Sequence, residues 1–277
     1  MKSALLSLLF ISSQIMGSTI AVIDSGVDVK HKDFVNNLWV NLSEIADNGR
    51  DEDGNGYQDD VYGWNFAEQN NLVIDRKYLG TFSADPYLFF EIQGKLFLQQ
   101  ATEAEVQWLR DKTADPLFLK EMQKFGNFVH GTHVAGITVN SSQDANILSV
   151  KLIPTEISPF AEQMQFKVSE DGIDQTKDGW RLKLLKTGLA ALAGEQMKAL
   201  EEIATYVGGH KADIANGSFG TGYPQAKGIT DMLFKNIMGR EPSSKEGDDL
   251  AKYFVNQLVL QGKNMVDAAP DTLFVFA

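Results

Sequence analysis

Cysteine is absent from the 277 residues of this chain, and histidine occurs only four times. Without a thiol there is no cysteine nucleophile, no disulfide framework and no thiolate ligand for zinc. Any chemistry must therefore come from carboxylates, hydroxyls, amides and those few imidazoles.

Positive charge is also scarce, because 25 Lys and Arg residues are set against 37 Asp and Glu residues, giving a net charge of −12. A surface of that sign repels a phosphate backbone, so we expect no nucleic-acid partner. The apolar run from Ala4 to Ile11 is far shorter than the roughly 20 residues that a membrane-spanning helix requires. We therefore expect no membrane span.

The same short run has the flanks of a secretory signal peptide. Lys2 precedes it, and small or polar residues follow it as far as Gly17 and Ser18. This order predicts that residues 1–18 are a signal peptide and that the protein is exported, to the periplasm or the medium of a bacterium. The alternative is an N-terminal helix that packs on the domain.

Four short apolar runs alternate with longer segments of helical period. The runs TIAVI, ILSVKLI, ADIAN and TLFVF are typical of strands buried on both faces, at residues 19–23, 147–153, 212–216 and 272–276. Residues 182–207 and 247–260 carry the helical period between them. The alternation predicts an α/β fold with a doubly wound, mostly parallel sheet over residues 19–277.

Two segments interrupt this plan. Residues 75–125 are amphipathic and rich in aromatic side chains, with Asp-Pro breaks, and they predict a helical insertion that lies over the domain. Residues 155–179 are more polar and contain Asp and Gly turn signals, which indicate a surface loop.

Asp24 is the first candidate functional residue, because it follows the first buried strand directly. Catalytic and ligand-binding groups of open α/β sheets gather outside the carboxyl ends of the strands. The alternative is that its carboxylate merely caps the turn that Ser25 and Gly26 begin.

The stretch NFVHGTHVAGI places His130 and His133 three residues apart. The small residues after His130 indicate a helix start, with His130 in its first turn and His133 buried one turn further on. A zinc pair of the H-E-x-x-H kind needs a spacing of four and a third ligand, and His31 and His210 are the remaining histidines. The pattern also fits two structural histidines, or a single general base, which small neighbours suit.

An acidic loop lies between Asp24 and His130 in the sequence. Its D-x-D-x-N-G start places oxygen atoms at alternate positions, as calcium loops do, and predicts a structural calcium ion. The candidate ligands are Asp51, Asp53, Asn55 and Asp59. Tyr62 stands where an EF-hand has a bidentate glutamate, so a solvated acidic turn is the alternative.

Four stretches together resemble the subtilisin-like serine proteases, or subtilases. IAVIDSGVDVKHKDF and HGTHVAGI are similar to the Asp and His motifs of that family. ADIANGSFG resembles the strand that lines its substrate groove, and DEDGNGYQDDVYGWNF resembles an acidic loop of many bacterial members. The resemblance covers roughly residues 19–277 apart from the two interrupting segments.

The resemblance implies a subtilisin-like fold and a serine-type endopeptidase that acts on peptides or proteins. Asp24 would orient the imidazole of His130, which would act as general base and then as acid. His133 would be structural. The nucleophilic serine should come last in the chain order Asp, His, Ser.

The groove strand implies three substrate-binding residues. Ser218, Phe219 and Gly220 would pair with the substrate backbone and wall the specificity pocket. Ser218 has a glycine on one side only of a G-x-S-x-G pattern, and Ser243 with Ser244 lies in a polar loop. We therefore expect none of these serines to be the nucleophile.

The sequence departs from the family at the nucleophile itself. It contains no G-T-S-M-A-x-P motif and no A-x-G-N segment with the asparagine that stabilises the oxyanion. We expect a fold that is incomplete at the C-terminus and a chain that is inactive alone, since such losses cost about 10⁶ in kcat. The alternatives are a fragment or pseudoprotease that binds a peptide or partner, or half of a split enzyme completed by a separate chain carrying the serine.

Overall fold

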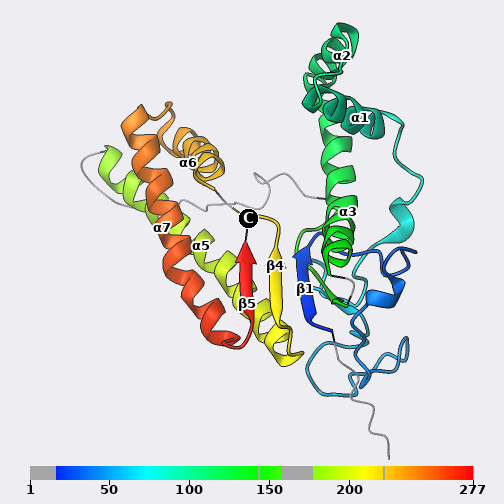
Figure 1. Cartoon of the computed structure of the whole chain (residues 1–277). Coiled ribbons are helices and arrows are strands. Elements are labelled where there is room, and N and C mark those ends of the chain that lie inside the picture. Colours follow the sequence, from blue (N-terminus) through cyan, green and yellow to red (C-terminus); the bar gives the residue numbers. More distant parts are fainter. Residues whose placement is uncertain (1–16, 143, 157–176, 221, 277) are drawn as a thin grey trace, which may run out of the picture.

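A five-stranded parallel sheet forms the centre of the protein (Figure 1). The structure, a computed structural model, describes residues 17–142, 144–156, 177–220 and 222–276. The strand order is β2-β3-β1-β4-β5, and every neighbouring pair is parallel. The expected α/β, doubly wound fold is therefore confirmed. The predicted signal peptide and the predicted surface loop at 155–179 lie largely outside the described residues.

The strands lie close to the predicted runs. They are β1 (Thr19–Asp24), β2 (Gly63–Asn65), β3 (Asn146–Lys151), β4 (Ile214–Gly217) and β5 (Leu273–Phe276). The sequence did not indicate β2, because three residues are too few to show a period. The burial predicted for the last run is wrong: β5 is an edge strand that pairs with β4, and its side chains are largely exposed.

Helices cover both faces of the sheet. On one face, α3 (Pro116–Ser141) packs Ala135 and Val139 against Ile20, Val22 and Ile147. The other face is covered by α5 (Lys177–Gly209). Its residues Ile203 and Val207 pack against alternate β1 and β3 side chains, namely Ala21, Ile23, Leu148 and Val150. The even positions of β1 therefore face α3 and the odd positions face α5, as a period of two requires.

Two further helices extend the α5 side into a lobe. They are α6 (Tyr223–Met238) and α7 (Ser244–Ala268), and both lie beside α5 in Figure 1. Leu189, Phe234 and Phe254, one from each helix, share an apolar cluster. Ser243, which the sequence placed in a polar loop, instead caps α7 through a reciprocal bond with Glu246. No helix of the described residues is long and apolar enough to cross a membrane.

The predicted insertion is helical and projects from the domain. Two short helices, α1 (Asp85–Phe97) and α2 (Glu103–Thr113), pack at the end of α3 that is remote from the sheet (Figure 1). Asp115 caps the start of α3, and Pro116 occupies its first turn. The insertion therefore runs without a break into the helix that carries His130.

Candidate active site

Asp24 ends β1 with a carboxylate that is fully buried. The backbone N–H of Ser25 donates to its Oδ1 over 2.7 Å. Its own carbonyl accepts from the backbone of Leu152, which follows β3. The end of the strand and the turn after it therefore fix this side chain between two neighbouring chain segments.

His130 meets that carboxylate from α3. Its Nδ1 lies 2.8 Å from Asp24 Oδ1 and 3.0 Å from Oδ2. The Asp24 side chain is completely buried, whereas 48% of the His130 side chain is exposed. A buried carboxylate on Nδ1 fixes the orientation of the ring and directs Nε2 away from Asp24.

The close approach of α3 to the turn after β1 makes this contact possible. A Cβ on Gly131 would lie 2.4 Å from the carbonyl oxygen of Gly26, so only glycine fits there. Gly26 itself has a φ of +102°, a conformation that glycine adopts readily. Gly131 also donates its backbone N–H to Ser25 Oγ over 3.1 Å. The two glycines thus set the depth at which His130 docks.

Two predictions about the histidine helix are wrong. The helix begins at Pro116 rather than beside His130. It extends about four turns from His130 toward the N-terminus, into the predicted insertion. His133 is exposed rather than packed. The buried positions of α3 near it are Gly131 and Ala135, and a residue midway between them points to the opposite side of a helix.

A proton acceptor with a free Nε2 is suited to activating a hydroxyl group. Among the described residues, however, no hydroxyl is hydrogen-bonded to His130. Ser25 is already bonded to α3, and Ser218 Oγ accepts from Asn216 Nδ2 over 2.9 Å. Asp24 and His130 thus have the geometry of an acid–base couple, and the hydrogen-bond partners of these two serine hydroxyls do not include His130.

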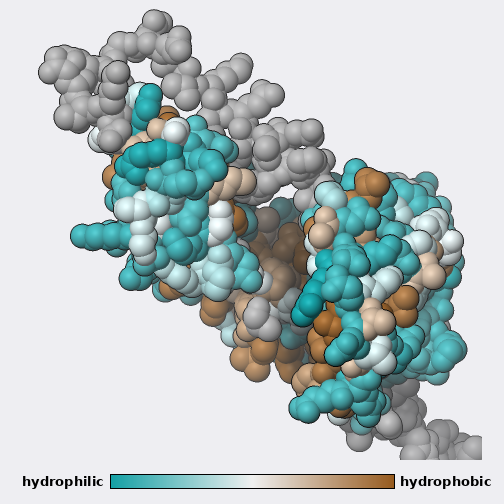
Figure 2. Space-filling model, turned by 90° about the horizontal axis from the view of Figure 1, so that it is seen from above, coloured by the Kyte–Doolittle hydropathy of each residue, from teal (hydrophilic) through white to brown (hydrophobic). Residues whose placement is uncertain are grey.

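Phe219 and Gly220 line an apolar cavity of about 590 Å³ between α5, α7 and the strand ends. Phe276, at the end of β5, closes the cavity beside Phe219, with the two ring centroids 5.7 Å apart. Ser218 is not among the residues that line it. Seen from the carboxyl ends of the strands, a hollow with an apolar floor separates the insertion from the α5–α7 lobe (Figure 2).

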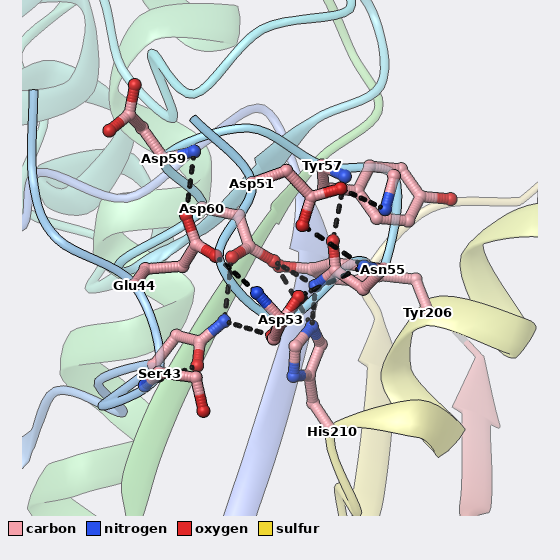
Figure 3. A network of polar contacts seen from close by, with 12 residues as sticks. Ser43, Glu44, Asp51, Asp53, Asn55, Tyr57, Asp59, Asp60, Tyr206 and His210 are labelled. Atoms are coloured by element: carbon pink, nitrogen blue, oxygen red, sulfur yellow. Dashed lines mark hydrogen bonds and ion pairs between the residues drawn. The ribbon is translucent and has the colours of Figure 1, made fainter. Parts of the chain in front are cut away.

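The acidic loop gathers three carboxylates near the amino end of the sheet (Figure 3). Oxygen atoms of Glu44, Asp51 and Asp53 lie within 4.8 Å of one another. Among the described residues this is the one group of three that could hold a metal ion, and it contains no histidine. Sequence spacing missed Glu44, which lies well before the D-x-D-x-N-G pattern.

The other two predicted ligands have different partners. Asp59 turns its carboxylate to the backbone N–H groups of Asn48 and Gly49, away from the three carboxylates. Asn55 donates its side-chain amide to Asp53 and Asp60, and its Oδ1 accepts from the backbone of Tyr57. Asp59 is therefore outside the group, and Asn55 borders it.

Asp60 joins the acidic loop to the end of α5. Its buried carboxylate accepts from Tyr206 over 2.8 Å and from Asn41 over 2.8 Å, and it lies 3.2 Å from His210 Nε2. Burial alone would raise the pKa of Asp60, but the hydrogen bonds from His210, Asn41 and Tyr206 hold it below its ordinary value. Burial beside this carboxylate raises the pKa of Tyr206. The network therefore favours an ionised Asp60.

Comparisons with known proteins agree with this geometry. Over 69 residues the chain is 44% identical to subtilisin-like protease 1 of Plasmodium falciparum (isolate 3D7), and over 71 residues it is 42% identical to the protein of the same name in Plasmodium vivax. These stretches cover 24% and 25% of this chain but 10% and 11% of the relatives. No solved structure matches the chain.

The aligned part thus spans about a tenth of the length of the curated relatives that it matches. A family model covers far more of the chain, because the model of the subtilase family matches residues 16–277. On the strength of that match, together with a buried aspartate and a helix-borne histidine in contact at the end of a parallel sheet, this chain belongs to the subtilase family of serine proteases.

Proposed function

We propose that the chain supplies the Asp–His part of a serine endopeptidase that cleaves peptide bonds through an acyl-enzyme. The contact between His130 Nδ1 and Asp24 supports this most directly. In such a couple His130 takes the proton of a serine hydroxyl and later returns it to the leaving amine, while Asp24 stabilises the imidazolium.

The nucleophilic serine of this proposal lies outside the 277 residues. The serine motif of the family is missing from the sequence, and the hydroxyls of Ser25 and Ser218 have other partners. A serine on a following segment, or on a separate chain, would complete the triad near Nε2 of His130. Without it, only binding and a residual background rate remain.

A fluorophosphonate probe tests this proposal, because it labels activated serines. The purified chain should stay unlabelled, and sequencing the gene beyond the codon for Ala277 should reveal a G-T-S motif in one of the reading frames. The longer product should be labelled, and His130→Ala should abolish that labelling. Labelling of the 277-residue chain that disappears in Ser218→Ala would contradict the assignment of the serine.

A second candidate function is peptide binding without hydrolysis, and the apolar cavity beside Phe219 favours it. Fluorescence anisotropy with a labelled peptide library separates the two functions. A gene without any G-T-S motif, together with peptide binding that Phe219→Ala weakens, would replace the protease assignment by this one.

We also propose that the acidic loop holds a structural divalent cation, with calcium the best fit. Three carboxylates that converge repel one another unless a cation intervenes, and hard oxygen ligands suit calcium rather than zinc. Glu44, Asp51 and Asp53 would be its side-chain ligands. The cation would stabilise the loop and take no part in the chemistry at His130.

A further inference from the structure

Aromatic side chains form an exposed stripe along α1 of the insertion. Tyr87, Phe90 and Phe97 are 56%, 49% and 87% exposed, and the exposed Gly94 lies between the last two. These four residues are three, four and three positions apart, which is the spacing by which one helix packs against another. The stripe therefore has the pattern of a contact between helices.

Helix α3 covers one end of this stripe. Tyr87 and Phe90 lie against Phe125 of α3, with ring centroids 5.0 and 6.0 Å apart. Farther along the helix, a Cβ on Gly94 would meet nothing within 4 Å, and Phe97 faces solvent. No described residue therefore covers the part of the stripe from Gly94 to Phe97.

The fold of the described residues does not require the glycine of this stripe. A glycine inside a helix costs about 1 kcal/mol relative to alanine, and Gly94 has neither a positive φ nor a neighbour that a Cβ would meet. The missing side chain does allow a second backbone to approach closely. The open space at Gly94 is therefore suited to another helix that crosses α1 there.

The charged residues of α1 leave the stripe neutral. All three are ion-paired inside the insertion: Glu91 and Lys95 lie 2.8 Å apart, Lys95 also lies 2.8 Å from Glu105 of α2, and Asp85 is bonded to Lys112. Anionic lipid surfaces attract clusters of basic side chains, and α1 offers none. The stripe thus fits an apolar protein surface.

The exposed apolar area of α1 is large enough for a dimer. The side chains that contribute to it are Tyr87, Leu88, Phe90, Leu96, Phe97 and the C-cap Leu98. If each has about 200 Å² to bury, their exposed parts amount to roughly 600 Å². Two such faces together would bury about 1,200 Å², the size at which stable specific interfaces begin.

We propose that α1 is a homodimer interface, in which α1 of a second copy crosses it in antiparallel orientation beside Gly94. A two-fold axis there makes one surface complementary to itself. The order of the charges favours this arrangement, because Glu91 of one copy lies level with Lys95 of the other, whereas a parallel pair would set Glu91 against Glu91. The insertion projects from the domain (Figure 1), so two copies meet at their insertions with their sheets apart. The inference does not depend on the proposed protease function.

Sedimentation equilibrium of the 277-residue chain measures the association. We expect a reversible dimer in the micromolar range. Salt should strengthen it, because the interface is apolar while each copy carries a net charge of −12 that salt screens. A chain that stays monomeric at every concentration and at high salt would refute the proposal.

Two substitutions separate the interface from the fold. Phe97→Ser and Gly94→Gln should each weaken the dimer about tenfold or more, because they remove an anchor or fill the crossing point. In urea denaturation at a concentration where the chain is monomeric, Phe97→Ser should be nearly neutral. Gly94→Gln should stabilise the monomer by up to about 1 kcal/mol, since glutamine is the better helix former.

Two matched controls should keep the dimer. Leu42→Ser removes an apolar side chain that is 92% exposed on the acidic loop, and Gly136→Ala replaces a helical glycine with open space around it on α3. A dimer that survives Phe97→Ser and Gly94→Gln would refute the α1 interface. Its loss in Val275→Lys instead would place the contact at the exposed edge of β5.

Cross-linking tests the orientation, and the absence of cysteine makes each introduced thiol unique. A short bis-maleimide should join two copies of Gln93→Cys near the axis. It should not join Gln100→Cys, because the antiparallel arrangement sets those two positions about 20 Å apart. Efficient linking at Gln100 would refute that arrangement. A monomer that floats with phosphatidylcholine vesicles, and no longer does so in Phe97→Ser, would assign the stripe to lipid and overturn the dimer.

Discussion

At the scale of single residues, the side chains of Asp24 and His130 differ in burial. Asp24 is fully buried and receives the backbone N–H of Ser25, whereas half of the His130 side chain faces solvent. The motifs indicated both residues, but the sequence could not show this difference. Nor could it place His133, because burial depends on which side of α3 the sheet covers.

Asp60 shows how burial and hydrogen bonding make stability depend on pH. Its folded pKa is depressed by His210, Asn41 and Tyr206, so its contribution is present above the unfolded value of about 3.9 and is lost as the pH falls through the folded value. The free energy of unfolding should therefore decline below about pH 5, and Asp60→Asn should weaken that decline. Urea titrations from pH 3 to pH 7 with a chelator present measure this.

The matched control is Asp271→Asn, since Asp271 is exposed and has no hydrogen bond among the described residues. At pH 7 the Asp60 variant should lose about 1–3 kcal/mol, because buried donors lose a charged acceptor. An Asp60 variant with the pH profile of the Asp271 variant would show that this network does not control acid stability.

At the scale of elements, the continuity of α3 decides the geometry of the site. The sequence has an Asp-Pro pair at 115–116, which can end one element or begin the next. In the structure it begins a helix of 26 residues, so the end of the insertion and His130 share one helix. Local sequence could not settle this, because the helix is held by distant contacts with Ser25 and Gly26.

Gly131 should be the least replaceable position of α3. Gly131→Ala brings a Cβ to 2.4 Å from the carbonyl of Gly26, and we expect a loss of about 1–3 kcal/mol in the free energy of unfolding. Gly136→Ala on the same helix meets nothing within 4 Å and should be neutral or stabilise by up to about 1 kcal/mol. Urea denaturation compares the two variants; equal stabilities would mean that the glycine contact is dispensable.

At the scale of the whole molecule, the two ends of the sheet carry different groups. The carboxyl ends carry Asp24 and Lys151, and Figure 2 shows a hollow on the side of the molecule to which these strand ends point. The amino end carries the acidic loop, which Asp60 fastens to His210 directly before β4 (Figure 3). An ion in the loop would therefore act on the stability of the whole domain, far from the chemistry.

Calcium should accordingly raise the melting temperature of the chain. A ligand at 100 times its Kd adds about 2.7 kcal/mol, which corresponds to a rise of several degrees for a domain of this size. Asp53→Asn should remove most of the rise, because Asp53 belongs to the group of three carboxylates. Asp47→Asn, on an exposed position of the same loop, should keep it.

Differential scanning fluorimetry with calcium or a chelator measures this response, and magnesium serves as a test of selectivity. An equal melting temperature with calcium and with chelator would refute the structural cation. A response that survives in Asp53→Asn would place the ion elsewhere.

The sequence by itself determined the fold class and the family, and its motifs singled out Asp24 and His130, because these depend on short motifs and on local period. Only the tertiary structure decided the partners of each side chain. Glu44 joins the carboxylates, Asp59 leaves them, and Lys151 is bonded to Glu68, since each of these contacts joins segments that are separate in sequence. Strand register and the packing of helices on the sheet set these contacts, and neither can be predicted from a single stretch of the sequence.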